Sequence, residues 1–374
     1  MTNPIPFIDL KAQQVLLKDE IDRRMQDVLA HGRYIMGPEI EEFEDALKKF
    51  TGARNVVTCS SGSDALLMAL MAENIGPGDA VFVPTFTFTA SAEVILLLGA
   101  TPVYVDVDER EFNIDCNDLK AKIEETDKDP SLTPRVIMPV DLFGLPADYG
   151  RLRAIADRNG LMVLGDAAQS FGGEQNDVPV GALTDVTATS FFPAKPLGCY
   201  GDGGAIFTDD NERADILRSI RAHGKGGAKY DIVRVGVNGR LDTLQAAILL
   251  AKMTRFDEER DAREDLAAYY DSRLGNVVDT PRRVAGSRSA WAQYSILLDN
   301  RDHVAAALKE KGVPTAIYYP LPMHLQSAYR EFGDGIGSMP VSESLSKRIL
   351  SLPMHPYMDE ATRVKICDEL VTLI

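Results

Sequence analysis

The chain has few cysteines and histidines, and those it has are not grouped. Its four cysteines are scattered over 374 residues without a Cys-X-X-Cys pair, and its five histidines are equally dispersed. The cysteine pattern argues against a disulfide framework and predicts a reduced, cytoplasmic protein. The dispersed histidines indicate no metal cluster, so we expect no bound metal.

Long apolar runs and an excess of basic charge are also missing. The longest apolar runs, such as residues 92–100, are far too short to span a bilayer. The first residues, MTNPIPFIDLKAQQ, lack the basic and apolar regions of a signal peptide. A formal net charge of -16, from 40 basic and 56 acidic residues, argues against a nucleic-acid partner but leaves an anionic small ligand open. We therefore expect neither a membrane nor a nucleic-acid partner.

Between residues 50 and 210 the chain alternates short apolar runs with helical patterns. Near-continuous apolar strands separated by helices predict an α/β fold, with a mostly parallel sheet covered by helices on both faces. The expected strands are 55–59, 80–84, 101–107, 135–140, 161–166, 186–192 and 204–209. In such sheets ligands bind beyond the carboxyl ends of the strands.

The pattern changes near residue 245, where we expect a domain boundary. Residues 1–245 would form a large domain and 246–374 a smaller α+β domain. A long helix over 241–274, with a charged second half, is expected to link the two. In the second domain, AQYSILL and PTAIYYP are expected as strands, HVAAALKEKG as a helix, and a last helix from Asp359.

Lys195 lies in a stiff, apolar stretch, SFFPAKPLGCYGDGGA (190–205). A lysine in a proline-rich turn is ordinarily a solvated surface residue. Here the flanking phenylalanines and prolines would desolvate the ammonium group and lower its pKa, which gives a neutral amine suited to a Schiff base with an aldehyde. The glycines that follow would allow close backbone approach.

Asp166 ends an apolar strand 29 residues before Lys195. An aspartate at this point commonly caps the next helix. In the alternative interpretation its carboxylate faces a pyridinium nitrogen and keeps the ring of pyridoxal phosphate (PLP) protonated, so that the ring withdraws electrons. An aspartate and a lysine at two strand ends favour PLP as the cofactor.

A phosphate site is predicted where CSSGSDALL (59–67) passes from a strand into a helix. Gly62 and Ser63 would offer free backbone N–H groups at the helix start, and Ser190 could add a hydroxyl. A simple capping turn explains the same residues equally well. Neither GxxxxGK[ST] nor GxGxxG occurs in the chain.

Three more side chains are candidates with common structural alternatives. Phe88, in PTFTFTA (84–90), could stack on a pyridine ring, although such a residue is more often part of the core. Asn238 and Arg240, in VGVNGRLD (235–242), precede the linking helix and could equally cap it or form a surface ion pair.

With these residues in place, the chain resembles the DegT/DnrJ/EryC1/StrS family of nucleotide-sugar aminotransferases, which are fold-type-I PLP enzymes. The resemblance covers essentially the full length, and several spaced motifs in the right order are more specific than any one of them. The motifs are FIDLKAQQ (7–14), GRYIMGPEIEEFE (32–44), CSSGSDALL, PTFTFTA, GDAAQSFGG (165–173), SFFPAKPLGCYGDGGA, VGVNGRLDTLQAAIL (235–249), YYPLPMHLQ (318–326) and SLPMHPYM (351–358).

The resemblance implies a role for each cofactor-site residue. Lys195 matches the lysine that forms the Schiff base with PLP and later moves the proton, and Asp166 matches the pyridinium partner. Gln169 matches the side chain that contacts the phenolic oxygen of the cofactor. Gly62, Ser63 and Ser190 match the family's phosphate-binding residues, and Phe88 matches the aromatic residue that stacks on the cofactor ring.

The resemblance also implies an obligate homodimer with shared active sites. Asn238 matches a residue that reaches the cofactor phosphate across the interface, and Arg240 a residue on the substrate side of the partner. L-glutamate is the usual amino donor and leaves as 2-oxoglutarate. A keto-sugar nucleotide then accepts the amino group, so ping-pong kinetics are expected.

Within the family, the chain looks closest to the branch that aminates 3-keto sugars. The nearest members act on UDP-2-acetamido-2-deoxy-3-oxo-D-glucuronate, for O-antigen and related surface polysaccharides. Arg240 could pair with the uronate carboxylate. Tyr319 and His324 would line the sugar site, against the alternatives of a core tyrosine and a surface histidine, and Tyr34 would border the substrate.

Three other functions remain open on the sequence. The first is amination of UDP-3-keto-GlcNAc or of a 4-keto-6-deoxy sugar. The second is a PLP-dependent sugar dehydratase, but there the family variation places histidine at the position of Lys195. The third is a non-catalytic regulatory or scaffold protein, against which every matched cofactor position carries a competent residue.

Overall fold

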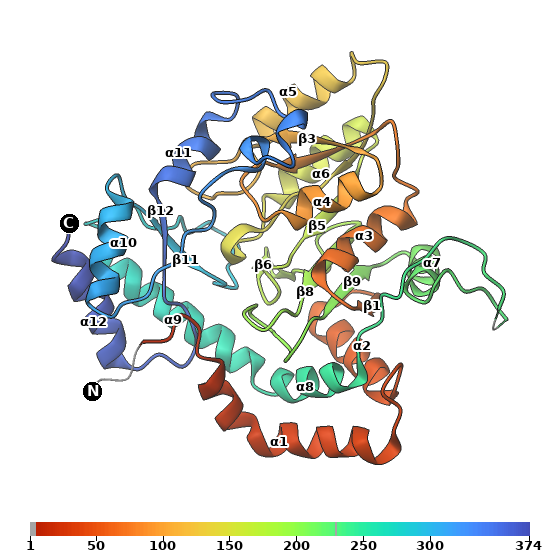
Figure 1. Cartoon of the computed structure of the whole chain (residues 1–374), viewed down its shortest axis with the longest axis horizontal. Helices are drawn as coiled ribbons and strands as arrows, with labels where there is room; N and C mark the ends of the chain where they lie inside the picture. The colour runs from red at the N-terminus through yellow and green to blue at the C-terminus, as the bar shows by residue number, and fades with distance from the viewer. Residues whose placement is uncertain (1–4, 229) are drawn as a thin grey trace.

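The computed structural model describes residues 5–228 and 230–374 (Figure 1). Its centre is a seven-stranded sheet in the order β1-β9-β8-β5-β4-β2-β3. All neighbouring strands are parallel except β9, which is antiparallel to both β1 and β8. The expected α/β fold with a mostly parallel sheet is therefore confirmed. The strands are β1 (Asn55–Cys59), β2 (Asp79–Pro84), β3 (Thr101–Val105), β4 (Thr133–Ile137), β5 (Met162–Asp166), β8 (Val186–Ser190) and β9 (Gly204–Thr208).

Helices cover both faces of this sheet because its central strands are buried on both sides. One face packs on α3 (Gly62–Ala72), α4 (Ala90–Leu97) and α7 (Asn211–Arg221). The other face packs on α2 (Pro38–Thr51), α5 (Cys116–Thr126), α6 (Tyr149–Asn159) and α8 (Thr243–Met253). Successive residues of β2 show the alternation, since Val81 and Val83 join the first core and Phe82 the second.

The helix α1 (Leu10–His31) lies along α8 at the lower edge of Figure 1. Asp9 caps its start by accepting a hydrogen bond from the N–H of Ala12, and Gly32, at φ 68°, ends it in the left-handed conformation. The helices α1 and α8 are far apart in the sequence but pack side by side in the fold.

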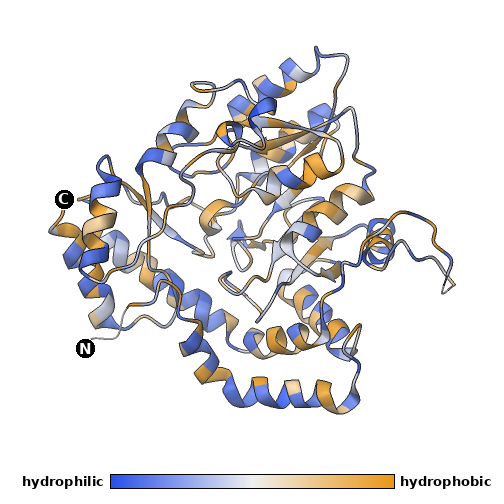
Figure 2. Cartoon of the chain, viewed as in Figure 1, coloured by the Kyte–Doolittle hydropathy of each residue, from blue (hydrophilic) through white to orange (hydrophobic). Residues whose placement is uncertain are grey.

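The expected linking helix over 241–274 is two helices, α8 and α9 (Phe256–Leu274). The hydroxyl of Thr254 donates back to the carbonyl of Ala251, and α9 starts afresh after Arg255. Figure 2 shows the difference in character, with α8 largely hydrophobic and α9 mostly hydrophilic.

A smaller unit lies beyond α9, and both ends of the described chain lie beside it (Figure 1). It has a core of its own around the antiparallel pair β11 (Tyr294–Leu297) and β12 (Ile349–Leu352). Its helices include α10 (Arg301–Glu310), α11 (Pro340–Arg348) and α12 (Glu360–Val371), and α12 is capped by Asp359 as expected. The boundary expected near residue 245 falls inside α8, so the division into two domains stays a prediction.

The stretch PTAIYYP was expected as a strand, but it forms only one bridge, from Ala316 to Ser351. Pro314 and Pro320 lack the N–H groups that a strand ladder needs. A small sheet of β6 (Glu174–Gln175), β7 (Val178–Pro179) and β10 (Ser287–Arg288) and three short 3₁₀ helices, Leu142–Gly144, Met323–Leu325 and Arg330–Phe332, complete the fold. Among the described residues, no helix is both long and apolar enough to cross a membrane.

Candidate active site

Lys195 lies on a tight loop that follows β8. Its backbone N–H donates to the carbonyl of Phe192 at 2.9 Å, and the N–H of Cys199 returns to the carbonyl of Phe191 at 2.8 Å. A side chain at Gly198 would lie 2.5 Å from the carbonyl oxygen of Pro193, so only glycine fits there. Burial lowers the pKa of the Lys195 amine, and the charge of Asp166 partly opposes this.

Asp166 is the last residue of β5, which pairs with β8 in parallel. Its Oδ2 accepts from the Ser91 hydroxyl at 2.8 Å and its Oδ1 from the N–H of Ala168 at 3.1 Å. Burial raises the pKa of this carboxyl group, while these hydrogen bonds and Lys195 lower it. Both of these hydrogen-bond donors are neutral. A protonated ring nitrogen placed here would add a positive charge beside the Asp166 carboxylate and stabilise its ionised form.

Gln169 follows three residues after Asp166 and is held from both ends of its amide. Its Oε1 accepts from the N–H of Phe143 at 2.7 Å, and its Nε2 donates to the Tyr319 hydroxyl at 3.2 Å. The Tyr319 ring centre lies 6.2 Å from that of Phe88. Phe88 is 55% exposed in the single chain and is therefore not a core residue. Its ring is thus available to a ligand.

The start of α3 meets the end of β8 at the expected phosphate site. A Cβ on Gly62 would lie 2.6 Å from the Cβ of Ser190, so glycine is needed for these segments to approach. Ser61 caps the helix by accepting from the N–H of Asp64, and Ser63 is exposed in the first turn. The positive end of the helix dipole and free N–H groups at this place suit an anion.

Asn238 and Arg240, which are expected to serve the partner subunit, lie at the surface on a segment bonded to the loop of Tyr34, which is expected to border the substrate. The Nε of Arg240 donates to Oδ1 of Asn238 at 3.0 Å, and Gly239 between them accepts from the N–H of Ser60 at 3.0 Å. The carbonyl of Tyr34 accepts from the N–H of Thr243 at 3.0 Å, which ties the Tyr34 loop to the same segment. Tyr34 is 47% exposed. No hydrogen bond described here joins these three residues to Lys195, and their roles stay predictions.

His324 lies inside the protein and not at the surface of the site. Its ring is fully buried, with Nδ1 2.7 Å from the Thr85 hydroxyl and Nε2 3.3 Å from Oε1 of Glu343. Both ring nitrogens therefore have protein partners, and the surface alternative is excluded as well. This geometry gives no support to the expected sugar contact. It assigns His324 to holding the loop that carries Thr85 and, three residues on, Phe88.

Two contributors to the site were missed in the sequence. Ser91, which binds Asp166, lies in a helical apolar stretch with no distinguishing pattern. Phe143, which orients Gln169, has a left-handed backbone with φ 60°. The DLFG sequence (141–144) around it gives little indication of this turn. A left-handed backbone is expected at glycine, but here Phe143 also adopts it.

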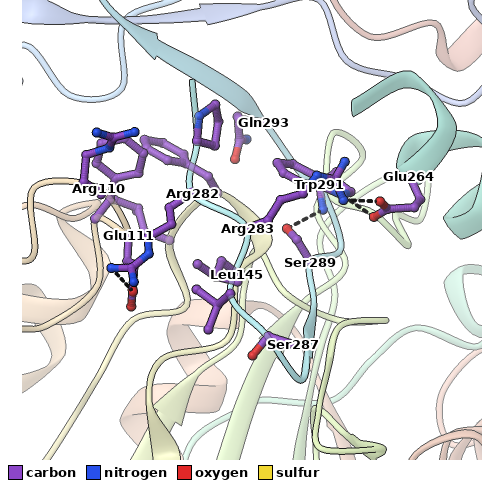
Figure 3. Close-up of a pocket in the computed structure, with 15 residues that line it drawn as sticks. Arg110, Glu111, Leu145, Glu264, Arg282, Arg283, Ser287, Ser289, Trp291 and Gln293 are labelled. Carbon is purple, nitrogen blue, oxygen red and sulfur yellow. Dashed lines mark hydrogen bonds and ion pairs between the residues drawn. The ribbon is translucent and has the colours of Figure 1, made fainter. Parts of the chain in front are cut away.

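A hollow of about 50 Å³ is lined in part by the loop at residues 142–145 (Figure 3). Arg282 faces Glu111 across it at 3.2 Å, and the indole N–H of Trp291 donates to Glu264 at 2.7 Å. The guanidinium group of Arg283 is also paired, with Glu264. Lys195, Asp166 and Gln169 do not line this hollow, which is therefore distinct from the candidate site, although Phe143 lines the hollow and donates its backbone N–H to Gln169.

Comparison with known proteins agrees with this geometry. Residues 16–371 match the model of the DegT/DnrJ/EryC1/StrS aminotransferase family. UDP-2-acetamido-2-deoxy-3-oxo-D-glucuronate aminotransferase of Pseudomonas aeruginosa is 48% identical over 98% of this chain and 99% of its own. UDP-N-acetyl-3-dehydro-alpha-D-glucosamine 3-aminotransferase of Acidithiobacillus ferrooxidans is 40% identical over 97% of this chain and 96% of its own.

Solved structures point the same way. A DegT DnrJ EryC1 StrS aminotransferase from Brucella abortus has a TM-score of 0.97 and 52% identity, and 99% of each chain is covered. The PLP form of a putative sugar aminotransferase from Streptococcus pneumoniae has a TM-score of 0.88 and 25% identity, over 95% of this chain and 96% of that one. The expectations of a sugar aminotransferase and of PLP as its cofactor are confirmed.

Proposed function

Because the chain belongs to the DegT/DnrJ/EryC1/StrS aminotransferase family, we propose that it moves an amino group from L-glutamate to C3 of UDP-2-acetamido-2-deoxy-3-oxo-D-glucuronate. The observation that carries this proposal is the placement of Lys195 and Asp166. Asp166 ends one of two paired parallel strands and Lys195 lies on the loop after the other, so a buried carboxylate and a half-buried amine with a lowered pKa come from neighbouring strands. That pair is what proton transfer beside a pyridine ring requires.

The residues at the site fit PLP. When bound, PLP supplies an aldehyde that takes up nitrogen and a protonated ring that withdraws electrons from the reacting carbon. Asp166 would hold the ring nitrogen protonated, and Gln169 would direct its Nε2 at the phenolic oxygen. The first turn of α3, with Gly62, Ser63 and Ser190, would hold the phosphate.

The chemistry left to this chain is the movement of one proton. The lowered pKa of Lys195 favours the neutral amine, which can take a proton from the α-carbon of the donor. In the second half-reaction the same group returns a proton to the sugar carbon. Phe88 and Tyr319 would cover the cofactor side of the cleft and exclude water.

The uronate part of the proposal rests on two features. The relative with 48% identity acts on that sugar by name, and Arg240 offers a guanidinium group suited to a carboxylate. Arg240 would act from the partner subunit, together with Asn238 at the cofactor phosphate, and Tyr34 would border the substrate. The buried ring of His324 gives no support to a role in this contact.

A homodimer, a cytoplasmic location and a role in O-antigen synthesis complete the proposal. Exposed apolar side chains stand near Tyr34 and Asn238 in the sequence, Ile35 and Met36 directly after Tyr34 and Val235 three residues before Asn238. A second copy of this chain would remove them from water. Nucleotide sugars are cytoplasmic substrates, in agreement with the unpaired and buried cysteines.

A panel of keto-sugar nucleotides tests the proposal. Turnover with L-glutamate would be followed through 2-oxoglutarate release for the UDP-3-keto uronate, UDP-3-keto-GlcNAc and a 4-keto-6-deoxy sugar. We expect the uronate to have the highest kcat/KM, with Arg240→Lys lowering it more for the uronate than for UDP-3-keto-GlcNAc. Turnover of the 4-keto sugar alone would overturn the proposal. UDP-3-keto-GlcNAc is the second candidate because a relative that aminates it is 40% identical.

A further inference from the structure

Lys252 is a buried cation that the proposed reaction does not use. It lies near the end of α8, and only 1% of it is exposed. Its Nζ donates to the carbonyl of Gly198 at 2.5 Å and lies 4.2 Å from the centre of the Tyr200 ring. Burying an ammonium group is costly, and a methionine of similar length would fill the space without that cost. The contact with Gly198 therefore needs a reason.

Gln245 holds the same loop from the same helix. It lies seven residues before Lys252, which is about two helical turns and places both on one face of α8. Its Oε1 accepts from the N–H of Tyr200 at 2.9 Å. The helix thus binds one carbonyl and one N–H, at Gly198 and Tyr200, just after Lys195.

The loop passes these restraints on to Lys195 because it is closed on itself. The hydrogen bond from Cys199 to Phe191 and the one from Lys195 to Phe192 join its two arms. Gly198 is in such close contact with Pro193 that no Cβ fits between them. A shift at Gly198 would therefore move the backbone of Lys195 as well.

Among the residues that the structure describes, no carboxylate forms an ion pair with Lys252. Burial lowers the pKa of Lys252 to about 8, and the charge of Glu259 on α9 partly opposes this. Glu259 itself accepts hydrogen bonds from Gln13 and from the Tyr357 hydroxyl. The direct contacts of the Lys252 ammonium group are thus a hydrogen bond to the Gly198 carbonyl and a cation–π contact with the Tyr200 ring.

We propose that Lys252 and Gln245 are positioning residues, which hold the loop after β8 so that the Lys195 amine points at the reacting carbon. The inference rests on the proposed function of Lys195. The segment before α8 carries Asn238 and Arg240, and the first and last turns of α8 hold the loop of Lys195 through Gln245 and Lys252.

The first test measures the loop itself, without cofactor or substrate. Lys252→Met keeps the length of the side chain and removes its donors. We expect amides of residues 197–201 to exchange hydrogen about tenfold faster in this variant, because local opening becomes easier. Lys49→Met, an exposed lysine on α2, is the matched control and should leave that exchange unchanged.

The second test measures catalysis. We expect Lys252→Met to lower kcat roughly tenfold to a hundredfold, since a small misplacement of a reacting group costs that much, while KM for L-glutamate stays within about twofold. Lys252→Arg, which keeps a cationic donor, should restore part of the lost kcat. A folded Lys252→Met protein with wild-type exchange and wild-type kcat would overturn the inference.

A third variant keeps the inference testable should Lys252→Met not fold. Gln245→Leu removes the acceptor for Tyr200 and should raise exchange at the same residues by a smaller factor; unchanged exchange would contradict the inference. The exchange measurement involves no chemistry. Wild-type protein that turns over no donor would therefore refute the proposed function and leave the loop result standing, so the two failures are distinguishable.

Discussion

The backbone N–H of Phe143 donates to Oε1 of Gln169 at 2.7 Å, and this bond fixes the direction of the Gln169 amide. A backbone N–H needs an oxygen acceptor, so the Nε2 group is left for the opposite side. There it donates to the Tyr319 hydroxyl at 3.2 Å. The amide therefore presents a donor, not an acceptor, to the place where the phenolic oxygen of the cofactor is proposed.

Gln169→Glu tests this orientation. The carboxylate can still accept from Phe143, but it has no N–H to donate toward the cofactor. We expect PLP to bind about tenfold more weakly, the effect of losing one hydrogen bond worth about 1.4 kcal/mol. A spectral titration measures the dissociation constant, with Gln14→Glu on the exposed face of α1 as control. Equal affinities for wild type and Gln169→Glu would contradict the proposed contact.

Asp141 gives a pH dependence of stability that can be isolated. Burial raises the pKa of its carboxyl group from 3.8 to about 7, although Ser170, Tyr149 and the N–H of Ala147 donate to it. Between roughly pH 4 and 7 the folded protein then binds more protons than the unfolded chain. The free energy of unfolding should fall as the pH rises through this window, by at most about 1.4 kcal/mol per pH unit from this group.

Urea unfolding at pH 5, 6 and 7 checks the Asp141 prediction. Asp141→Asn should be less stable overall and show a shallower fall with pH, because the titrating group is gone. Asp19→Asn, an exposed residue of α1, should keep the wild-type slope. A slope in Asp141→Asn as steep as in the wild type would show that other groups cause the fall.

His324→Leu separates a structural role from a substrate contact. The substitution leaves Thr85 and Glu343 without the bonds that the ring makes at 2.7 and 3.3 Å. We expect a loss of about 2 kcal/mol in the free energy of unfolding and little change in KM for the sugar. His303→Leu, at an exposed position, is the control. Unchanged stability with a KM raised tenfold would favour the sugar contact expected from the sequence.

Mixing two inactive variants tests the shared active site. Lys195→Ala lacks the catalytic amine, and Asn238→Asp would place a carboxylate against the partner's phosphate site. If Asn238 serves the other subunit, a mixed dimer contains one intact site. Dissociation and random reassociation of equal amounts should then restore about a quarter of wild-type activity. No recovery, with mixed dimers shown to form, would place Asn238 in its own subunit's site.

Much of the fold could be predicted because buried strands are continuous apolar runs. The runs at 55–59 and 204–209 coincide with β1 and β9, but nothing in them indicates that β9 runs antiparallel to its neighbours. The stretch PTAIYYP has strand-like residues, yet its prolines limit it to a single bridge. The break after α8 depends on the Thr254 hydroxyl, which a helical pattern does not report.

The candidate site could be predicted where a residue's neighbours in sequence are also its neighbours in space. Lys195 was found from the phenylalanines and prolines of its own loop, and Asp166 from its place at the end of an apolar strand. His324 and Lys252 could not be interpreted in this way. Thr85, which binds His324, is 239 residues away, and Gly198, which binds Lys252, is 54 residues away.

The visible spectrum of the purified protein tests the central claim most directly. Wild-type protein with PLP should be yellow, lose that colour on addition of L-glutamate, and regain it with 2-oxoglutarate. Lys195→Ala should show no such reversible change, because the amine that moves the proton is missing. A colourless wild-type protein that takes up no PLP, or a Lys195→Ala protein that responds to L-glutamate as fast as the wild type, would contradict the account.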